Sequence, residues 1–405
     1  MTAGGQTLLR KNRRGSARLT LSTFGLRRRL DRRATPAHLD RSKMATALER
    51  RTGTGMLTRV TLKDIAKHAG VSPATVSLVL RNNPLAAQST RARVRSSIDS
   101  LGYVYDRAAA NLRARHTYTV GLVVCEITNP FYAELTAGMD DALDRAGWVA
   151  FLANTGESPA RQDRFIERMR EHRVDGLLLS PAEGTNPEVI ERLRSFGVPV
   201  VQVLRRLGRR NNDHVGADFR LGMKLAAEHL IQLGHRRIAF IGGGRHASPA
   251  RDRARAYRET LTRHGLPLGP IVDCLPTREE GERAVEHLMS GGSDHPTAII
   301  CHNDICAIGV LVGLSDRGLV AGKDCAVIGF DNIPEAAHSR PALTSIDIGA
   351  RQIGEEAANL LLRRIKAPSD PPESIVLPPR LVIRSSCGGP FAQARATIPL
   401  QTIGE

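Results

Sequence analysis

The stretch VTLKDIAKHAG, from Val60 to Gly70, is followed directly by VSPATVSLVL, from Val71 to Leu80. Thr61 stands three residues before Asp64, a spacing typical of a capping box at the start of a helix. Gly70 occupies the position at which a left-handed residue ends a helix. The first stretch therefore predicts a short helix that is bounded at both ends.

The second stretch predicts another helix directly after a tight turn. Ser72 is a suitable N-cap, and Pro73 fits the first helical position, where no backbone N–H is needed. A third helix is expected from Ser89 to Gly102. Three short helices with a glycine-centred turn between the first two indicate a helix-turn-helix that reads DNA, and a generic helical hairpin is the alternative.

Positive charge gathers around this motif. Residues 56 to 115 contain 10 Lys and Arg against 3 Asp, a net charge of +7, whereas residues 116 to 405 carry 34 basic and 35 acidic side chains, a net charge of −1. Residues 1 to 55 contribute 14 basic and 3 acidic side chains, or +11, which completes the total of +17. Such a local positive field is typical of a surface that binds nucleic acid phosphates.

Residues 1 to 55 are expected to be disordered or not translated at all. Their only aromatic residue is Phe24, and their arginines follow no apolar periodicity. Met44 and Met56 are alternative translation starts beside Met1. No apolar stretch approaches about 20 residues, and the arginine-rich start lacks an apolar signal core, so we expect a soluble protein of the cytoplasm and nucleoid that does not enter membranes.

The six cysteines are scattered through apolar segments, which favours reduced thiols over a disulfide framework. Cys301, His302 and Cys306 lack a second pair at the spacing of a zinc site. No catalytic signature of a hydrolase or a metal enzyme is present. The sequence therefore predicts neither an enzyme nor a bound metal or cofactor.

Apolar runs alternate with helix-length segments from residue 118 to residue 388. The runs are VGLVV, WVAFLA, VDGLLLS, VPVVQV, RIAFIGG, TAIICHND and CAVIGFD. Continuous apolar strands indicate parallel sheets covered by helices on both faces, and this length requires two such layers. We therefore expect an α/β core of two doubly wound lobes after the all-α headpiece, with a ligand at the carboxyl ends of the strands.

Polar and aromatic residues that follow these strands are the candidate ligand contacts. An aromatic face together with arginine, amide and carboxylate groups is suited to sugar hydroxyls. Because Arg206, Arg209 and Arg210 surround Arg205, a solvated basic loop is the alternative at that position, and Asp304 is expected to be a helix N-cap. The candidates are Asn129, Phe131, Tyr132, Arg205, Arg253, Asn303 and Asp331.

Several motifs in order resemble those of the LacI/GalR family of bacterial transcriptional repressors. They are VTLKDIAKHAGVSPATVS, GHRRIAFIGG from Gly234, CHNDICAIG from Cys301, VIGFDN from Val327 and RPALTSI from Arg340. PFYAELTAGM, from Pro130 to Met139, also resembles the branch that contains maltose-regulon repressors. The resemblance implies a homodimer in which each subunit has a headpiece (56–105), a hinge helix (106–117) and a core (118–388) whose lobes are similar to periplasmic sugar-binding proteins.

The resemblance also implies positions that contact a pseudo-palindromic operator. Base-reading positions fall on Pro73, Ala74 and Leu78, which are apolar here and suit contact with thymine methyl groups and readout of DNA shape. Phosphate contacts are expected from Ser72, Thr75, Ser77 and Arg81.

The segment DRAAANLRAR, from Asp106 to Arg115, is too short to be a stable helix alone. The resemblance implies that it folds on DNA, with Leu112 as a minor-groove wedge and Ala109 at the contact between paired hinge helices. A plain linker is the alternative. The tail 389–405 lacks leucine heptads, which favours a dimer over a tetramer.

The resemblance places family pocket positions on Arg253, Asn303 and Asp331, whereas Ala350 replaces an aromatic residue of the lactose repressor. The expected function is a transcriptional regulator, and specifically a repressor, switched by a small carbohydrate between the lobes. A sugar phosphate or a purine is the alternative effector, and a sugar receptor without a regulatory role is the alternative class. The sequence does not decide between inducer and corepressor, nor does it identify the operator.

Overall fold

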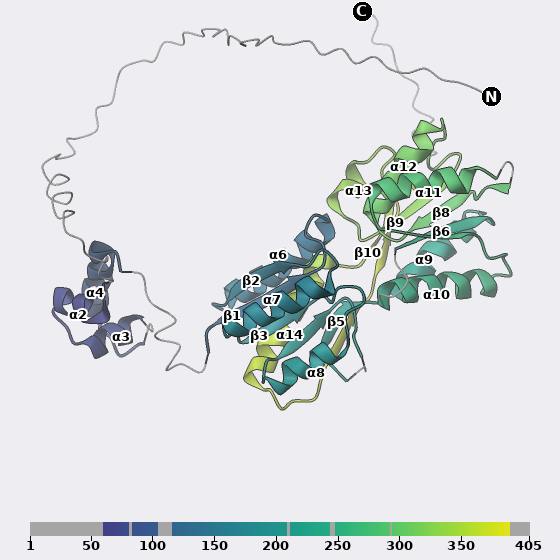
Figure 1. Cartoon of the computed structure of the whole chain (residues 1–405). Helices are drawn as coiled ribbons and strands as arrows, with labels where there is room; N and C mark the ends of the chain where they lie inside the picture. Colours follow the sequence, from purple (N-terminus) through teal and green to yellow (C-terminus); the bar gives the residue numbers. More distant parts are fainter. Residues whose placement is uncertain are drawn as a thin grey trace, which may run out of the picture. The chain divides into compact units, whose positions relative to one another are not determined.

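The computed structural model describes residues 60–80, 83–103, 116–208, 211–243, 248–291 and 294–388 (Figure 1). The chain divides into two compact units, Met1–Tyr105 and Asp106–Glu405. The predictions for residues 1–55, Arg81, the segment 106–115 and the tail 389–405 lie outside the described residues.

The first unit contains three helices, α2 (Leu62–Ala69), α3 (Pro73–Leu80) and α4 (Gln88–Leu101). The predicted capping box is confirmed, because the Thr61 side chain accepts from the Asp64 N–H and the Asp64 carboxylate accepts from the Thr61 N–H at 2.8 Å. Gly70 ends α2 in the left-handed conformation with φ of 64°. A small core then holds the three helices together around the fully buried side chains of Ile65, Val76 and Val94.

The second unit consists of two lobes, each a six-stranded sheet with helices on its faces (Figure 1). The first sheet has the order β11-β5-β4-β3-β1-β2 and is parallel throughout. Its strands are β1 (Thr119–Val124), β2 (Val149–Asn154), β3 (Gly176–Leu179), β4 (Val200–Val203), β5 (His214–Ala217) and β11 (Ser374–Leu377). Its helices are α6 (Pro130–Arg145), α7 (Pro159–Glu171), α8 (Glu188–Ser195) and α14 (Ala350–Lys366).

The second sheet has the order β12-β10-β9-β8-β6-β7, and only its edge strand β12 is antiparallel to its neighbour. Its strands are β6 (Ile238–Gly243), β7 (Ile271–Cys274), β8 (Ala298–Cys301), β9 (Ala326–Phe330), β10 (Thr344–Asp347) and β12 (Arg380–Val382). Its helices are α9 (Phe219–Gln232), α10 (Ser248–Arg263), α11 (Arg278–Met289), α12 (Asp304–Asp316) and α13 (Pro334–His338), followed by the short 3-10 helix η2 (Ser385–Cys387).

No helix in the described part of the chain is both long and apolar enough to cross a membrane.

The predicted two-lobed α/β core with parallel sheets is confirmed. The seven apolar runs correspond to β1, β2, β3, β4, β6, β8 and β9. Each of the other five strands, β5, β7, β10, β11 and β12, contains a polar or charged residue within three or four positions, so they gave no comparable apolar run. The chain passes between the lobes three times, after β5, after β10 and between β11 and β12.

Two glycines allow α6 and α14 to pack closely in the first lobe. A Cβ atom at Gly354 on α14 would overlap the carbonyl oxygen of Leu135, and one at Gly138 on α6 would overlap that of Arg351. Both neighbours are backbone atoms of helices, which cannot move aside as a flexible side chain can. The close approach of the two helices therefore requires glycine at both positions.

We predict that Gly354→Ala lowers the free energy of unfolding by about 1–3 kcal/mol, because the overlap with backbone outweighs the gain of about 1 kcal/mol in helix propensity. Urea unfolding measures the change. Asn359→Ala, at an exposed position of the same helix, is the matched control and should be near neutral. An equal or higher stability of Gly354→Ala would show that the helices can separate at no cost.

Candidate functional site

A cavity of about 520 Å³ lies between the lobes, where the carboxyl ends of both sheets meet. All seven residues that the sequence nominated as ligand contacts line it: Asn129, Phe131, Tyr132, Arg205, Arg253, Asn303 and Asp331. The lining also includes polar residues that the sequence analysis did not name as ligand contacts, among them Glu126, Thr128, Glu157, Thr277, Arg278, Glu279 and His302. Ala350 lines a neighbouring cavity instead.

In the first lobe, the start of α6 presents an aromatic wall. Asn129 is the N-cap, and its side-chain oxygen accepts from the Phe131 N–H at 3.0 Å. Phe131 and Tyr132 are buried, with ring centroids 5.4 Å apart in an edge-to-face arrangement. The cap uses the carbonyl oxygen of Asn129, so its amide NH₂ group is the part suited to a ligand.

Arg205 forms a bidentate ion pair with Glu157 at the rim of the cavity. Its guanidinium nitrogens lie 2.7 and 2.6 Å from the two carboxylate oxygens of Glu157, and it also donates to the Pro181 carbonyl at 3.0 Å. Only 17% of the Arg205 side chain is exposed, so the alternative of a solvated basic loop is wrong for this residue. Burial opposes ionisation of Glu157, but the hydrogen bonds from Arg205 outweigh it and lower the pKa of Glu157.

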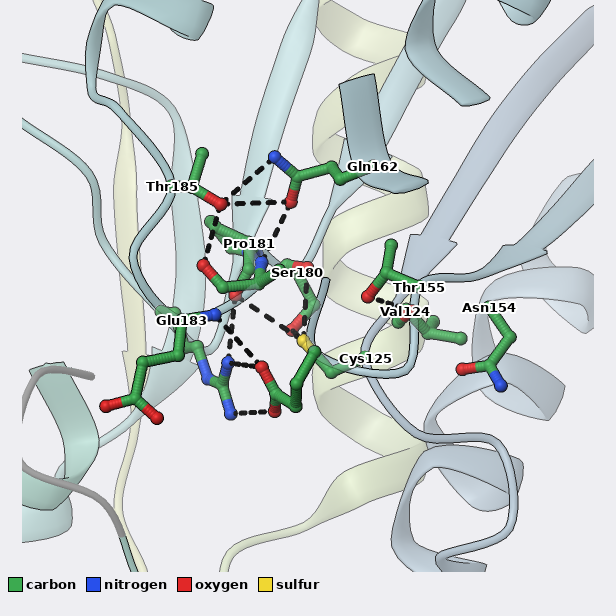
Figure 2. A network of polar contacts seen from close by, with 12 residues as sticks. Val124, Cys125, Asn154, Thr155, Gln162, Ser180, Pro181, Glu183 and Thr185 are labelled. Atoms are coloured by element: carbon green, nitrogen blue, oxygen red, sulfur yellow. Dashed lines mark hydrogen bonds and ion pairs between the residues drawn. The ribbon is translucent and has the colours of Figure 1, made fainter. Parts of the chain in front are cut away.

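A buried polar network, which shares the Pro181 carbonyl with Arg205, joins the loops of the first lobe (Figure 2). The Gln162 side chain accepts from the Ala182 N–H at 2.8 Å and donates to the Thr185 hydroxyl at 3.1 Å. The Cys125 thiol lies 3.4 Å from the carbonyl oxygens of both Ser180 and Pro181. The segments after β1, β2 and β3 are thereby held together behind the cavity wall.

In the second lobe, Arg253 of α10 is buried against aromatic rings. Its guanidinium carbon lies 4.6 Å from the ring centroid of Phe219 and 4.2 Å from that of Phe330. One of its terminal nitrogens is 3.9 Å from the Asp331 carboxylate, and its Nε has no hydrogen-bond partner. Burial lowers the pKa of Arg253 to about 10, and the nearby Asp331 carboxylate only partly offsets this effect. The site thus holds a buried guanidinium whose hydrogen-bonding capacity the protein itself does not fully use.

Asp331 follows β9 in an unusual conformation. Its φ of 105° lies in the left-handed half of backbone space, which non-glycine residues rarely adopt. Burial raises its pKa to about 7, although Arg253 opposes the rise. Strained backbone and a displaced pKa at one cavity residue are typical of a functional site.

At the start of α12, the capping role expected of Asp304 belongs to Asn303, which also lines the cavity. Asn303 is the N-cap and accepts from the Cys306 N–H at 2.9 Å, so the prediction that Asp304 caps this helix was wrong. Asp304 is instead buried, where it accepts from the Ser345 hydroxyl at 2.6 Å and the Ile333 N–H at 2.8 Å. It fixes the segments around the cavity but does not line it.

The sequence reasoning missed Glu157, Phe219 and His302. His302 directly follows the AIIC strand, so the same strand-end rule could have found it. Its Nδ1 is buried without a partner, and burial holds its pKa well below the usual value. Phe219 follows the short strand β5, which the apolar pattern did not reveal. Glu157 is recognised only from its ion pair with Arg205, which is 48 residues away in the sequence.

In the helix-turn-helix unit, Ser72 accepts from the Thr75 N–H at 3.1 Å, and the two hydroxyls lie 2.9 Å apart. Pro73 and Ala74 are exposed, whereas Ser77 and Leu78 are partly buried. Arg81, Ala109 and Leu112 lie outside the described residues.

Two family models match this chain. The model described as "Bacterial regulatory proteins, lacI family" matches residues 61–106, and that of a "Periplasmic binding protein-like domain" matches residues 227–387.

Curated relatives and a solved structure align with about four fifths of this chain. The ribose operon repressor of Escherichia coli (strain K12) is 34% identical over 330 residues, which are 80% of this chain and 99% of that protein. The HTH-type transcriptional repressor PurR of Haemophilus influenzae (strain PittEE) is 31% identical over 331 residues, 80% of this chain and 98% of that protein. The solved complex of the transcriptional regulator CelR with cellobiose is 31% identical, with a TM-score of 0.62, over 81% of this chain and all of that one.

We predict that Asp331→Asn changes the pH dependence of stability. Because the folded pKa of Asp331, about 7, lies above its ordinary value of 3.8, the folded protein retains a proton that the unfolded chain releases, and stability falls as pH rises from about 4 to 7. Asparagine removes this effect, which amounts to up to about 4 kcal/mol.

The measurement is urea unfolding at several pH values from 4 to 8. The free energy of unfolding of Asp331→Asn, minus that of the native chain, should increase as pH rises. Asp316→Asn, at an exposed position on α12, is the control. A constant difference across this range would contradict the raised pKa.

Proposed function

The chain belongs to the LacI family of bacterial regulatory proteins, and from this membership and the chemistry of the cleft we propose that it responds to a small, uncharged carbohydrate bound between its lobes. It is a DNA-binding transcriptional repressor with an effector-binding domain, and not an enzyme.

The arrangement around Arg253 is the observation that carries the proposal. A sugar hydroxyl can accept from a guanidinium and donate to a carboxylate at the same time, and Arg253 and Asp331 present this pair 3.9 Å apart in the cavity wall. The Nδ1 atom of His302 is a further buried polar atom without a partner. The faces of Phe131 and Tyr132 supply the apolar surface on which the C–H faces of a sugar ring pack.

The charges of the cavity favour an uncharged effector over a sugar phosphate. Four carboxylic groups line it, Glu126, Glu157, Glu279 and Asp331, against three guanidinium groups, Arg205, Arg253 and Arg278. Arg205 is already engaged by both oxygens of Glu157, so a phosphate would have to displace that carboxylate. The structure of CelR with cellobiose is in line with a carbohydrate, whereas the relative PurR keeps a purine as the alternative.

The proposed switch uses the two lobes. An effector that touches Arg205 in one lobe and Arg253 in the other favours the lobe arrangement in which both contacts form. This arrangement alters operator affinity, and the operator must alter effector affinity by the same factor. Either an inducer or a corepressor satisfies this scheme.

We further propose a homodimer that acts in the cytoplasm on nucleoid DNA. The edge strand β2 exposes apolar side chains, with Val149, Phe151 and Leu152 each between 46% and 49% exposed. An exposed apolar edge strand is a liability in a monomer, and a second copy of the chain would cover it. Two headpieces then match the two halves of a pseudo-palindromic operator.

In each headpiece, Pro73, Ala74 and Leu78 are the proposed base contacts, and Ser72, Thr75, Ser77 and Arg81 the proposed phosphate contacts. Exposure of Pro73 and Ala74 on the first turn of α3 supports this assignment. Ala109 and Leu112 are proposed as the hinge contact and the minor-groove wedge.

Thermal unfolding of the full chain against a ligand panel tests the effector proposal. The panel contains ribose, glucose, maltose, cellobiose, glucose 6-phosphate, inorganic phosphate, hypoxanthine and guanine. An uncharged sugar at about 100 times its dissociation constant should stabilise the native chain by about 2.7 kcal/mol and leave Arg253→Met unaffected. A response to purine or phosphate alone, or to no compound, would refute an uncharged carbohydrate effector of these types.

A binding selection tests the assignment of the recognition face. We predict that Leu78→Arg changes the preferred operator toward guanine at the contacted position, because arginine donates two hydrogen bonds to the guanine edge. The change should be worth about 1–3 kcal/mol of discrimination. An unchanged operator preference would show that Leu78 does not face the bases.

A further inference from the structure

We infer that Asp175 is a positioning residue for repression: it anchors, on the effector-binding unit, the end of the segment that tethers the DNA-binding unit. The inference rests on the repressor function described above and is independent of which effector the cleft binds.

Asp175 holds the first described residues of the second unit. One of its carboxylate oxygens lies 2.8 Å from the Thr117 N–H nitrogen, 2.6 Å from that of Tyr118 and 3.4 Å from that of Thr119. The Thr117 hydroxyl lies 2.9 Å from the same oxygen. Successive backbone N–H groups turned toward one carboxylate make a compact anion site, and only 8% of the Asp175 side chain is exposed.

The contacts around this carboxylate reinforce the anchor. The Asp175 N–H donates to the Thr119 carbonyl at 2.8 Å, so the two segments are bonded in both directions. Tyr118 and Arg173 adopt left-handed conformations with φ of 55° and 53°, and the Thr117 hydroxyl lies 3.1 Å from the Arg173 carbonyl oxygen. Non-glycine residues persist in this conformation only where their surroundings hold them.

Three rings form a cluster next to the anchor, and the Nδ1 atom of one of them, His116, lies 3.4 Å from the Asp175 carboxylate. The ring centroid of Tyr118 lies 5.2 Å from that of Trp148, and the His116 ring lies 6.3 Å from Tyr118 and 6.4 Å from Trp148. Trp148 is the only tryptophan of the chain. Its fluorescence is therefore a specific reporter of this region.

The anchor lies at the opposite end of β1 from the effector cavity. Thr119 is the first residue of β1 and Asp175 directly precedes β3, with which β1 pairs in parallel, so the anchor is at the amino ends of these strands. Glu126, Thr128 and Asn129, which follow the carboxyl end of β1, line the cavity. A buried six-residue strand of about 20 Å thus joins the cavity to the point where the tether leaves the unit.

This placement gives the carboxylate a mechanical role. Residues 106–115 immediately precede His116 in the chain, so an anchored start at Thr117 fixes where that segment leaves the first lobe. With the anchor intact, a movement of the lobe is passed to the tether. Without it, the first residues of the unit become additional free linker. Operator binding must then order these residues, and the loss of their conformational entropy weakens binding.

Operator binding by matched variants tests this role. The operator is a duplex selected from a random pool with the native full-length chain, and affinity is measured by fluorescence anisotropy. We expect Asp175→Ala to weaken operator binding about tenfold or more, within the usual range of coupling between sites. Asp175→Asn retains one acceptor oxygen and should restore part of the affinity, and Asp163→Ala, which removes an exposed ion pair of the same lobe, should change it less than about twofold.

A tether insertion separates positioning from a merely structural effect. Two glycines inserted between Arg115 and His116 leave every contact of Asp175 in place but uncouple the segment from the anchor. The insertion should weaken operator binding about as much as Asp175→Ala, and combining the two should add little. Trp148 fluorescence and thermal unfolding report whether each variant is folded.

Three outcomes would overturn the inference. They are native operator affinity in folded Asp175→Ala, native operator affinity in the insertion variant, and full additivity of the two changes. The insertion variant decides alone if Asp175→Ala does not fold. A failure of the sugar panel would leave these results unaffected, so the two proposals are tested separately.

Discussion

The site depends on one constraint of chain topology: three segments connect two mainly parallel sheets, and the carboxyl ends of their parallel strands meet at one cavity. A single connection would leave the lobes free to separate, whereas three connections restrict them to hinge-like movement. The polar groups that follow β1, β2 and β4 in one lobe and β6, β7, β8 and β9 in the other are thereby placed around the same volume. A ligand that bridges these two sets acts directly on the relative position of the lobes.

The cavity carries an energetic cost that the fold alone does not require. Burying a guanidinium costs several kcal/mol. The cation–π contacts of Arg253 with two Phe rings stabilise it by only about 0.5–2 kcal/mol each. The lowered pKa of Arg253 and the raised pKa of Asp331 both result from burial that their 3.9 Å ion pair does not fully offset. Such a cost is retained where the groups serve a ligand, whose hydroxyls can complete the missing hydrogen bonds. By contrast, Glu157 and Arg205 satisfy one another and stabilise the rim.

Much of this arrangement could be predicted from local sequence. The capping box of Thr61 and Asp64 depends on residues three positions apart, and the long apolar strands identify the sheets without knowledge of the fold. The rule that polar and aromatic residues after strands line a ligand site placed all seven candidates on the cavity. What the sequence could not give was pairing between distant segments. Arg205 forms its ion pair with a residue 48 positions away in the sequence. Asp304 accepts a hydrogen bond in the core from Ser345, which lies 41 residues further along the chain.

The most direct test of the account is thermodynamic linkage between the cleft and the DNA. Operator affinity is titrated with and without a saturating concentration of the sugar that stabilises the chain, and sugar affinity with and without operator. The account predicts that each ligand changes the affinity of the other by the same factor, about 5- to 150-fold, in the native chain and not in Arg253→Met. Equal operator affinity with and without the sugar would contradict it, because the cleft would then bind a ligand that does not control the repressor.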